Sequence, residues 1–362
     1  MDVHKTRCAR AQEEMRRQGI DLLFVSPSSD LVYLIGHHTY SSERLTLFML
    51  PASGDPAMVV PALEAPAARA AATFFSFRTW ADGDNPYALM RSLMPAVGRK
   101  VAVSDQTWSL HLINIQEALP RTNFVPASRV LAPLRRVKDA SEIAALKRAG
   151  TAADAAMADI LAMPLLGKSE HQVAGLISDL LIKHGHSRAD FGIVASGGNS
   201  GSPHHVNSDR VLQEGDALTL DFGGVYDDYS SDITRSVFLG APPDEYRRIY
   251  AIVGQAQQAA FEAVRPGVAC QEIDRAARRV ITAAGYGEYF IHRTGHGLGL
   301  DVHEEPYMVE GNTLPLVPGV VFSIEPGIYI PGRFGVRTED IVFVTESGGE
   351  RLNAAPRELR AL

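Results

Sequence analysis

The chain has 362 residues, more than one globular core usually needs, so its length predicts two domains. Hydrophobic residues make up 46% and charged residues 21%, and no apolar run approaches the ~20 residues of a bilayer-crossing helix, which excludes a disordered or membrane-spanning chain. A formal net charge of -7 without a block of basic residues excludes the electrostatic footprint of a nucleic-acid or anionic-membrane binder, so we expect a small-molecule partner.

The amino-terminal end and the cysteines indicate the compartment. The opening stretch, MDVHKTRCARAQEEMRRQGID, mixes charges throughout and lacks the apolar core of a secretory signal. Cys8 and Cys270 are the only cysteines and lie far apart in the sequence, which suits a reducing environment and excludes a disulfide scaffold or a thiolate zinc site. We therefore expect a cytoplasmic protein.

The first part of the chain reads as a small α/β domain. An amphipathic opening stretch precedes short apolar runs at 22–25, 45–50 and 101–103, which Pro, Ser, Gly and Asp bound on either side. Such runs are typical of strands that alternate with helices. A charged, proline-containing segment, RVLAPLRRVKDA, follows, and the predicted domains are residues 1–130 and 131–362.

The second domain mixes helices with antiparallel strands. Capping signatures and apolar periodicity predict three helices, which begin after Asp139, after Ser169 and at Asp244. Strand-like segments lie between and beyond them, at 217–225, 232–239, 320–329 and 336–345. These segments look like hairpins rather than crossover units, so the predicted class is α+β.

Four carboxylates interrupt these otherwise apolar strands. Asp221 lies opposite the apolar face of its strand, and a hairpin through YDDYSS brings it to Asp232. Glu325 shares a face with Ser323 in its strand, as Glu339 does with Arg337. Burial of a carboxylate costs several kcal/mol unless a partner compensates it, which makes these positions informative.

A histidine between glycines completes the candidate metal site. His296 lies in TGHGLGLDVHE, where the flanking glycines allow close backbone approach. Four converging carboxylates and one imidazole would repel one another unless cations lay among them, and this mixture of ligands suits manganese, cobalt or zinc. Two divalent ions balance four carboxylates, which favours the paired-metal arrangement of hydrolases.

These segments resemble the pita-bread metallopeptidases, a family that includes methionine aminopeptidase, aminopeptidase P and prolidase. The resemblance rests on LDFGG, YSSDITRS, HRTGHGLGLDVHEEP, SIEPGIYIPG and GVRTEDIVFVTE, in that order, and it covers Arg135 to the carboxyl terminus. Upstream, the length and the mixed α/β pattern are similar to the amino-terminal domain of the proline-specific branch. The resemblance implies a pita-bread catalytic domain, two divalent ions (manganese, cobalt or zinc) and a homodimer.

The resemblance also implies roles for the residues that match the family's motifs. Asp221 would bind one metal ion, Asp232 and Glu339 would bridge both, and His296 with Glu325 would complete the second. All five positions are filled, which argues against the metal-free branches of the family and against an inactive binding protein of the same fold. The hypothesis is a dinuclear hydrolase in which a hydroxide shared by the two ions attacks an Xaa-Pro bond.

The resemblance also implies roles for residues around the candidate metal site. Glu325 would shuttle the proton, and His204 and His303 would hydrogen-bond the scissile carbonyl and its oxyanion. Arg337 would orient the bridging carboxylates, and Thr234 could bond a metal-bound water. His205, in contrast, is interpreted as an ordinary loop histidine. Three further residues are candidates for lining the substrate pocket or lying near the metals: His292, Tyr229 and Tyr329.

The substrate's length stays open at this point. Many prolidases carry an arginine 11 residues past the metal-binding histidine to read the dipeptide carboxylate, and this chain has Tyr307 there. Arg44, from the amino-terminal domain or from a dimer partner, could supply the missing charge. We predict a dipeptidase for small Xaa-Pro peptides. The alternatives are an Xaa-Pro aminopeptidase acting on longer peptides, and a different reaction on a non-peptide substrate.

Overall fold

The computed structural model describes residues 3–94 and 100–362. The chain separates into two compact units, Met1–Arg135 and Arg136–Leu362, each with its own core. The predicted boundary between residues 130 and 131 falls inside helix α6 (Ser128–Arg136), and the boundary between the units lies at the end of that helix. None of the helices among the described residues has the length and apolarity that a membrane span requires.

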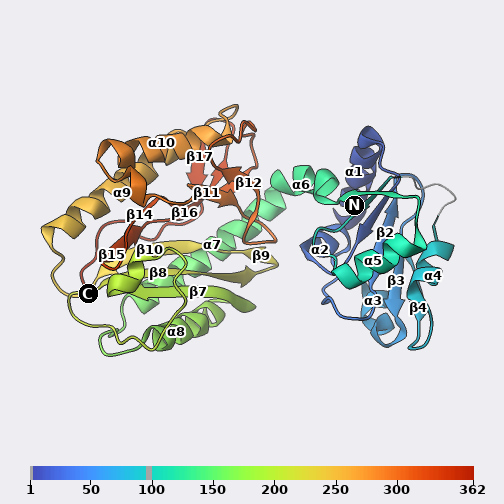
Figure 1. Ribbon diagram of the computed structural model, residues 1–362, viewed down its shortest axis with the longest axis horizontal. Helices are drawn as coiled ribbons and strands as arrows, with labels where there is room; N and C mark the ends of the chain where they lie inside the picture. The colour runs from blue at the N-terminus through green and yellow to red at the C-terminus, as the bar shows by residue number, and fades with distance from the viewer. Residues whose placement is uncertain (1–2, 95–99) are drawn as a thin grey trace. The chain divides into compact units, whose positions relative to one another are not determined.

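A six-stranded mixed sheet organises the amino-terminal unit, in the order β4-β3-β2-β1-β5-β6 (Figure 1). β2 runs antiparallel to both of its neighbours, and the other neighbouring pairs are parallel. The predicted strands correspond to β1, β2 and β5. The strands are β1 (Leu22–Val25), β2 (Leu47–Pro51), β3 (Ala57–Pro61), β4 (Ser76–Trp80), β5 (Lys100–Val103) and β6 (Asn123–Pro126).

Helices pack against this sheet and bury its apolar side chains. Leu22, Phe24, Val101 and Val103 from the central strands join Ile115 of α5 in one core. The helices of this unit are α1 (Val3–Gln18), α2 (Ser29–Ile35), η1 (Ala62–Glu64), α3 (Ala65–Ala71), α4 (Pro86–Ser92), α5 (Ser109–Ala118) and α6.

The carboxy-terminal unit contains two larger antiparallel sheets and one hairpin. The first sheet has the order β10-β8-β7 with β9 at its end, the second has the order β12-β11-β13-β16-β17, and β14 pairs with β15. The strands are β7 (Arg188–Ser196), β8 (Ala217–Tyr226), β9 (Tyr229–Ser230), β10 (Ile233–Phe238), β11 (Gly295–Gly297), β12 (Glu304–Met308), β13 (Val321–Ile324), β14 (Gly327–Ile330), β15 (Phe334–Arg337), β16 (Asp340–Val344) and β17 (Gly349–Arg351).

Each of these sheets has its own pair of helices (Figure 1). α7 and α8 share a core with β8 and β10, whereas α9 and α10 share one with β13, β14, β15 and β16. The combination of helices with antiparallel sheets confirms the predicted α+β class. The helical elements are α7 (Ala140–Ile160), α8 (Glu170–Lys183), η2 (Gly197–Gly201), α9 (Asp244–Glu262), α10 (Cys270–Ala283) and η3 (Gly287–Tyr289).

Three predicted helix starts are confirmed. Asp139 caps α7 and Ser169 caps α8, each within a complete capping box, and α9 begins at Asp244. A capping box pairs backbone N–H groups that the first helical turn cannot satisfy, which is why this signature is readable in the sequence.

The two predicted long strands are each divided, and this prediction was wrong. Glu325 and Pro326 separate β13 from β14, and Thr338 and Glu339 separate β15 from β16. Pro326 cannot donate a ladder hydrogen bond, so the chain leaves the second sheet at that point and enters the hairpin. Each division places a carboxylate where the backbone passes between sheets.

Candidate active site

Strand register brings the first two carboxylates together. β8 and β10 are antiparallel, and Thr234 pairs with Asp221, so Asp232 lies two residues from that pair. Asp227 and Asp228 adopt positive φ angles of 46° and 69° in the intervening turn. The predicted hairpin is therefore present, and both aspartates are buried.

His296 reaches the same place from β11, which lies between β12 and β13. A Cβ atom at Gly295 would overlap the carbonyl oxygen of Ser323, and one at Gly297 would overlap that of Glu305. These overlaps confirm the predicted need for glycine on both sides of His296. The histidine is thus held between two strands without room for larger neighbours.

The tautomer of His296 follows from its hydrogen bonds. Nδ1 donates to the carbonyl of Gly297 at 3.1 Å, because a carbonyl can only accept. Nε2 then carries the lone pair, and it lies 3.2 Å from Glu325 Oε1 and 3.7 Å from Asp232 Oδ2. A lone pair that faces two carboxylates is the arrangement of a metal ligand and is unfavourable without a cation or a proton between them.

The carboxylates themselves indicate a cation. Asp232, His296 and Glu339 each offer a ligand atom, and these atoms lie within 4.8 Å of one another. Asp232 Oδ1 and Glu339 Oε1 are buried and find no hydrogen-bond partner among the residues that the structure describes. Burial and neighbouring negative charges raise the pKa of both side chains well above their ordinary values. The residues present therefore fit divalent metal ions.

Arg337 is the buried cation beside this cluster. Nη2 donates to Asp221 Oδ2 at 2.6 Å, and Nη1 donates to the hydroxyl of Tyr329 at 2.7 Å. Nε donates to the Thr234 hydroxyl at 3.3 Å. That hydroxyl gives its own hydrogen to Glu339 Oε2 at 2.6 Å. The expected bond between Thr234 and a metal-bound water stays a prediction.

A short chain of hydrogen bonds continues from Arg337 to His292. The Tyr329 hydroxyl lies 2.9 Å from His292 Nε2, while His292 Nδ1 donates to the carbonyl of Arg293 at 2.7 Å. Nε2 therefore accepts from Tyr329. Burial raises the pKa of Tyr329 to about 12, so it remains protonated, and burial lowers the pKa of His292.

The other two predicted catalytic histidines lie along the same cavity. The ring of His303 stands edge-on to that of His296, with 4.1 Å between centroids. Burial lowers the pKa of His303 to about 4, so its imidazole is neutral at neutral pH and keeps one N–H donor. His204 is exposed and lines the cavity from the segment after η2.

A cavity of about 700 Å³ contains these groups. Sequence reasoning singled out neither the apolar residues of its wall nor Arg293. Its lining residues are Asp190, Phe191, Ile193, Pro203, His204, Asp221, Asp232, His292, Arg293, His296, Val302, His303, Glu325, Arg337 and Glu339.

Arg293 and Tyr307 form a stacked pair next to His296. Tyr307 pairs with His296 between β12 and β11, and the guanidinium carbon of Arg293 lies 4.2 Å from the centre of its ring. Among the described residues, the Arg293 side chain has no hydrogen bond or ion pair, although it lines the cavity. The HRTGHG motif contains this arginine, but only the fold shows that it reaches the cavity.

Two other candidates have different partners. The Tyr229 hydroxyl donates to Glu142 Oε1 at 2.9 Å in a core beneath β9, and Tyr229 is not among the described residues that line the cavity. Arg44 belongs to the amino-terminal unit, where it pairs with both carboxylate oxygens of Asp82 at 3.0 and 2.9 Å. His205, expected to be an ordinary loop residue, donates to the buried Glu170 at 2.7 Å.

Known proteins share this architecture. Metallopeptidase family M24 matches residues 144–346, and the creatinase/prolidase N-terminal domain matches residues 7–137. The probable dipeptidase PepE of Mycobacterium tuberculosis is 46% identical over 99% of this chain and 96% of that protein. A solved prolidase from Thermococcus sibiricus has a TM-score of 0.96 at 37% identity and covers 100% of both chains. An X-Pro aminopeptidase from Thermotoga maritima has a TM-score of 0.87 at 30% identity, covering 98% of this chain and 99% of that one. The chain therefore belongs to metallopeptidase family M24, and its carboxy-terminal unit has the pita-bread fold.

Proposed function

We propose that this chain is a dinuclear-metal Xaa-Pro dipeptidase. Asp221, Asp232, His296, Glu325 and Glu339 would hold the two divalent ions, with manganese as the first candidate. Divalent ions in such a site supply Lewis-acid chemistry, because they lower the pKa of water and polarise carbonyl groups. The orphaned oxygens of Asp232 and Glu339 and the match to metallopeptidase family M24 support the metal assignment. The prolidase and the Xaa-Pro dipeptidases among the similar proteins support the substrate.

The chain's own residues would handle the proton and the developing charge. Glu325 would accept the proton of the attacking water and deliver it to the proline nitrogen, which must be protonated to leave. Glu325 Oε1 accepts a hydrogen bond from the Ser323 hydroxyl at 3.0 Å, which holds the carboxylate in place as a proton acceptor. His204 and His303 would each donate a hydrogen bond to the scissile carbonyl and its oxyanion.

The preference for dipeptides in this proposal rests on Arg293, which would bind the free carboxylate of the substrate. A dipeptide places its free carboxylate one residue beyond the scissile bond, and a guanidinium binds a carboxylate more strongly than it binds a neutral amide. Arg293 lies in the cavity and its guanidinium has no bond to another described residue, so it can supply the charge that Tyr307 lacks. Phe191, Ile193 and Val302 give the same cavity apolar walls for the proline ring.

Three matched substrates test this proposal. We expect an Xaa-Pro dipeptide to be cleaved more efficiently than the same dipeptide with a carboxy-terminal amide, and more efficiently than an Xaa-Pro tripeptide. In Arg293→Gln the preference for the free acid over the amide should disappear, whereas Arg293→Lys should keep part of it. Faster cleavage of the tripeptide would instead assign the chain as an aminopeptidase.

The metal and the reaction type need separate measurements. Metal analysis of the purified protein should find about two divalent ions per chain, and thorough chelation should abolish the release of proline until manganese or cobalt is restored. Glu325→Gln should lose turnover. Proline release that survives complete metal removal would sink the metal assignment, and metal-dependent activity only on non-peptide substrates would redirect the proposal to another reaction.

A further inference from the structure

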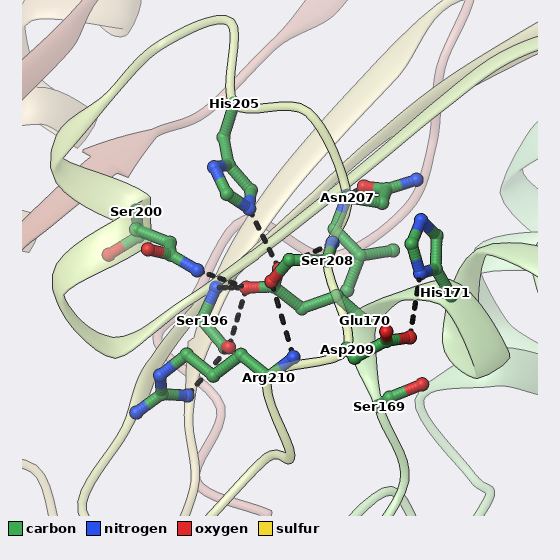
Figure 2. A network of polar contacts seen from close by, with 12 residues as sticks. Ser169, Glu170, His171, Ser196, Ser200, His205, Asn207, Ser208, Asp209 and Arg210 are labelled. Atoms are coloured by element: carbon green, nitrogen blue, oxygen red, sulfur yellow. Dashed lines mark hydrogen bonds and ion pairs between the residues drawn. The ribbon is translucent and has the colours of Figure 1, made fainter.

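Glu170 is a fully buried carboxylate at the start of α8 and takes no part in the chemistry described above. Figure 2 shows it surrounded by hydrogen-bond donors. Oε1 accepts from the Ser196 amide, the Ser196 hydroxyl and the Asn199 side chain at 2.7 to 3.0 Å. Oε2 accepts from His205 Nε2 and from the Ser208 amide and hydroxyl at 2.6 to 3.0 Å.

The donors to Glu170 share one segment of the chain. They lie between Ser196, the last residue of β7, and Ser208, and this segment contains η2. Pro203 and His204, near its middle, line the cavity. Glu170 therefore closes a ring of hydrogen bonds around both ends of the segment that presents His204.

Other contacts hold the same segment on its remaining sides. The Asn207 side chain takes the place of a strand neighbour for β7: it accepts from the Val194 amide at 2.8 Å and donates to the Gly192 carbonyl at 2.7 Å. The Gly335 amide donates to the Ser200 hydroxyl at 3.0 Å. The segment is thus fixed between β7, α8 and the hairpin that carries Arg337.

His204 itself depends on this frame. Its side chain is exposed and makes no hydrogen bond or ion pair with any described residue, so its position depends on the backbone that carries it. The neighbouring residue His205 points to Glu170 instead (Figure 2). The two adjacent histidines therefore differ in their surroundings: His205 is hydrogen-bonded to Glu170, and His204 lines the cavity.

We propose that Glu170 is a positioning residue for His204, acting through His205 and Ser208 to hold the segment in register with the metal cluster. This inference rests on the proposed function, in which His204 bonds the scissile carbonyl. A buried carboxylate suits this role because it can accept several charge-assisted hydrogen bonds at once, and loss of its charge leaves donors without a partner.

The test is a double-mutant cycle between Glu170→Gln and His204→Ala. Removal of a preorganised oxyanion donor lowers kcat by about 10²–10³-fold, and we expect His204→Ala to fall in that range. Glu170→Gln should lower kcat by about tenfold or more with KM nearly unchanged, and the double variant should match His204→Ala within about twofold. If the decrease in kcat of the double variant equals the product of the two single decreases, the proposal is overturned, because Glu170 would then act independently of His204.

A surface pair next to the Glu170 network, between His171 of α8 and Asp209, supplies the control. His171 Nδ1 lies 3.1 Å from Asp209 Oδ1, with the side chains 57% and 98% exposed, and Figure 2 shows this pair beside the buried network. Asp209→Asn should leave kcat unchanged. If Glu170→Gln does not fold, Ser208→Ala removes one hydroxyl donor, keeps the carboxylate and enters the same cycle.

Hydrogen exchange decides the proposal without any activity. Amide exchange over residues 202–208 should be faster in Glu170→Gln than in the parent protein, with or without metal, while exchange in β8 and β10 stays the same. Unchanged exchange over 202–208 would overturn the proposal. If the parent protein releases no proline from Xaa-Pro dipeptides, the proposed function fails, and the exchange measurement still decides whether Glu170 holds the segment.

Discussion

Thr234 and Glu339 are joined twice, once through side chains and once through the backbone. The Thr234 hydroxyl donates to Glu339 Oε2 at 2.6 Å, and the Glu339 amide donates to the Thr234 carbonyl at 3.1 Å. The backbone bond sets the register between the strand after Asp232 and the segment that carries Glu339, while the side-chain bond fixes which oxygen of Glu339 stays free.

Thr234→Val should weaken metal binding while it preserves the fold, because it removes the hydroxyl that orients Glu339. Removal of a hydrogen bond to a ligand side chain typically lowers metal affinity or activity by about 10–100-fold. Titration of the metal-free protein with manganese measures the change. Thr234→Ser keeps the hydroxyl and should bind nearly as well as the parent; equal loss in both variants would show that packing, and not the hydrogen bond, matters.

Arg337→Lys should reduce activity even though the charge is kept. A lysine cannot contact Asp221, Tyr329 and Thr234 at once, as the planar guanidinium does. We expect kcat/KM to fall by about 10–100-fold. Arg333→Lys is the matched control, since Arg333 lies on the same hairpin but pairs with the exposed Glu245. A normal rate for Arg337→Lys would leave Arg337 with a purely electrostatic role.

Metal loading should release protons, because the raised pKa values of Asp232 and Glu339 mean that the metal-free protein holds protons there. The same shifts give the metal-free protein a stability that falls as pH rises from about 4 toward neutral, because its folded state binds more protons than its unfolded state. Bound metal should remove that slope. Calorimetric titration in buffers of different ionisation enthalpy, with thermal melts across pH, measures both effects. A binding enthalpy that does not depend on the buffer would contradict the prediction.

The clustered carboxylates were predictable because they break a local rule. Asp221 and Glu325 are ionisable side chains that interrupt apolar stretches of the sequence, and a buried charge without a partner is too unfavourable to be incidental. The glycines around His296 were readable for a similar reason, since they permit a backbone contact that no other residue allows. Helix starts at Asp139 and Ser169 depend on residues three positions apart and need no knowledge of the fold.

Contacts between distant segments could not be predicted in this way. Arg293 looks like any charged residue within a motif, and its access to the cavity depends on how β11 and β12 pair. Glu170 reads as a favourable acidic residue in a first helical turn, whereas its partners lie 26 to 38 residues further along the chain. The two long strands were predicted because the apolar pattern of the sequence continues across Glu325 and Glu339. Only the pairing of β13 with β16 and of β14 with β15 shows that the chain changes sheets there.

Tyr307→Leu should weaken substrate binding through Arg293. The stacked ring holds the guanidinium at 4.2 Å, and a contact of this kind contributes about 0.5–1 kcal/mol at an exposed site, equivalent to a two- to fivefold change in KM. We expect KM for an Xaa-Pro dipeptide to rise by that factor with kcat retained. Tyr307→Phe keeps the aromatic face and should behave like the parent. If Tyr307→Phe shows the same rise in KM, the hydroxyl and not the ring contacts the substrate.

Glu170 should also give the protein an acid-sensitive contribution to stability. Burial raises its pKa, but the bonds from Ser208, Asn199, Ser196 and His205 outweigh this effect and lower the pKa from 4.5 to about 2. A carboxyl with a lowered pKa in the folded state stabilises the fold above its unfolded pKa and loses that contribution as pH falls through its folded pKa. The difference in unfolding free energy between the parent and Glu170→Gln should therefore be full above pH 4.5 and shrink as the pH falls toward 2.

Denaturant unfolding between pH 2 and pH 4.5 measures this difference, and Asp209→Asn, which alters only the surface pair, should show a much smaller difference. A gap between the parent and Glu170→Gln that does not change with pH would mean that shape, and not charge, is what the buried network requires.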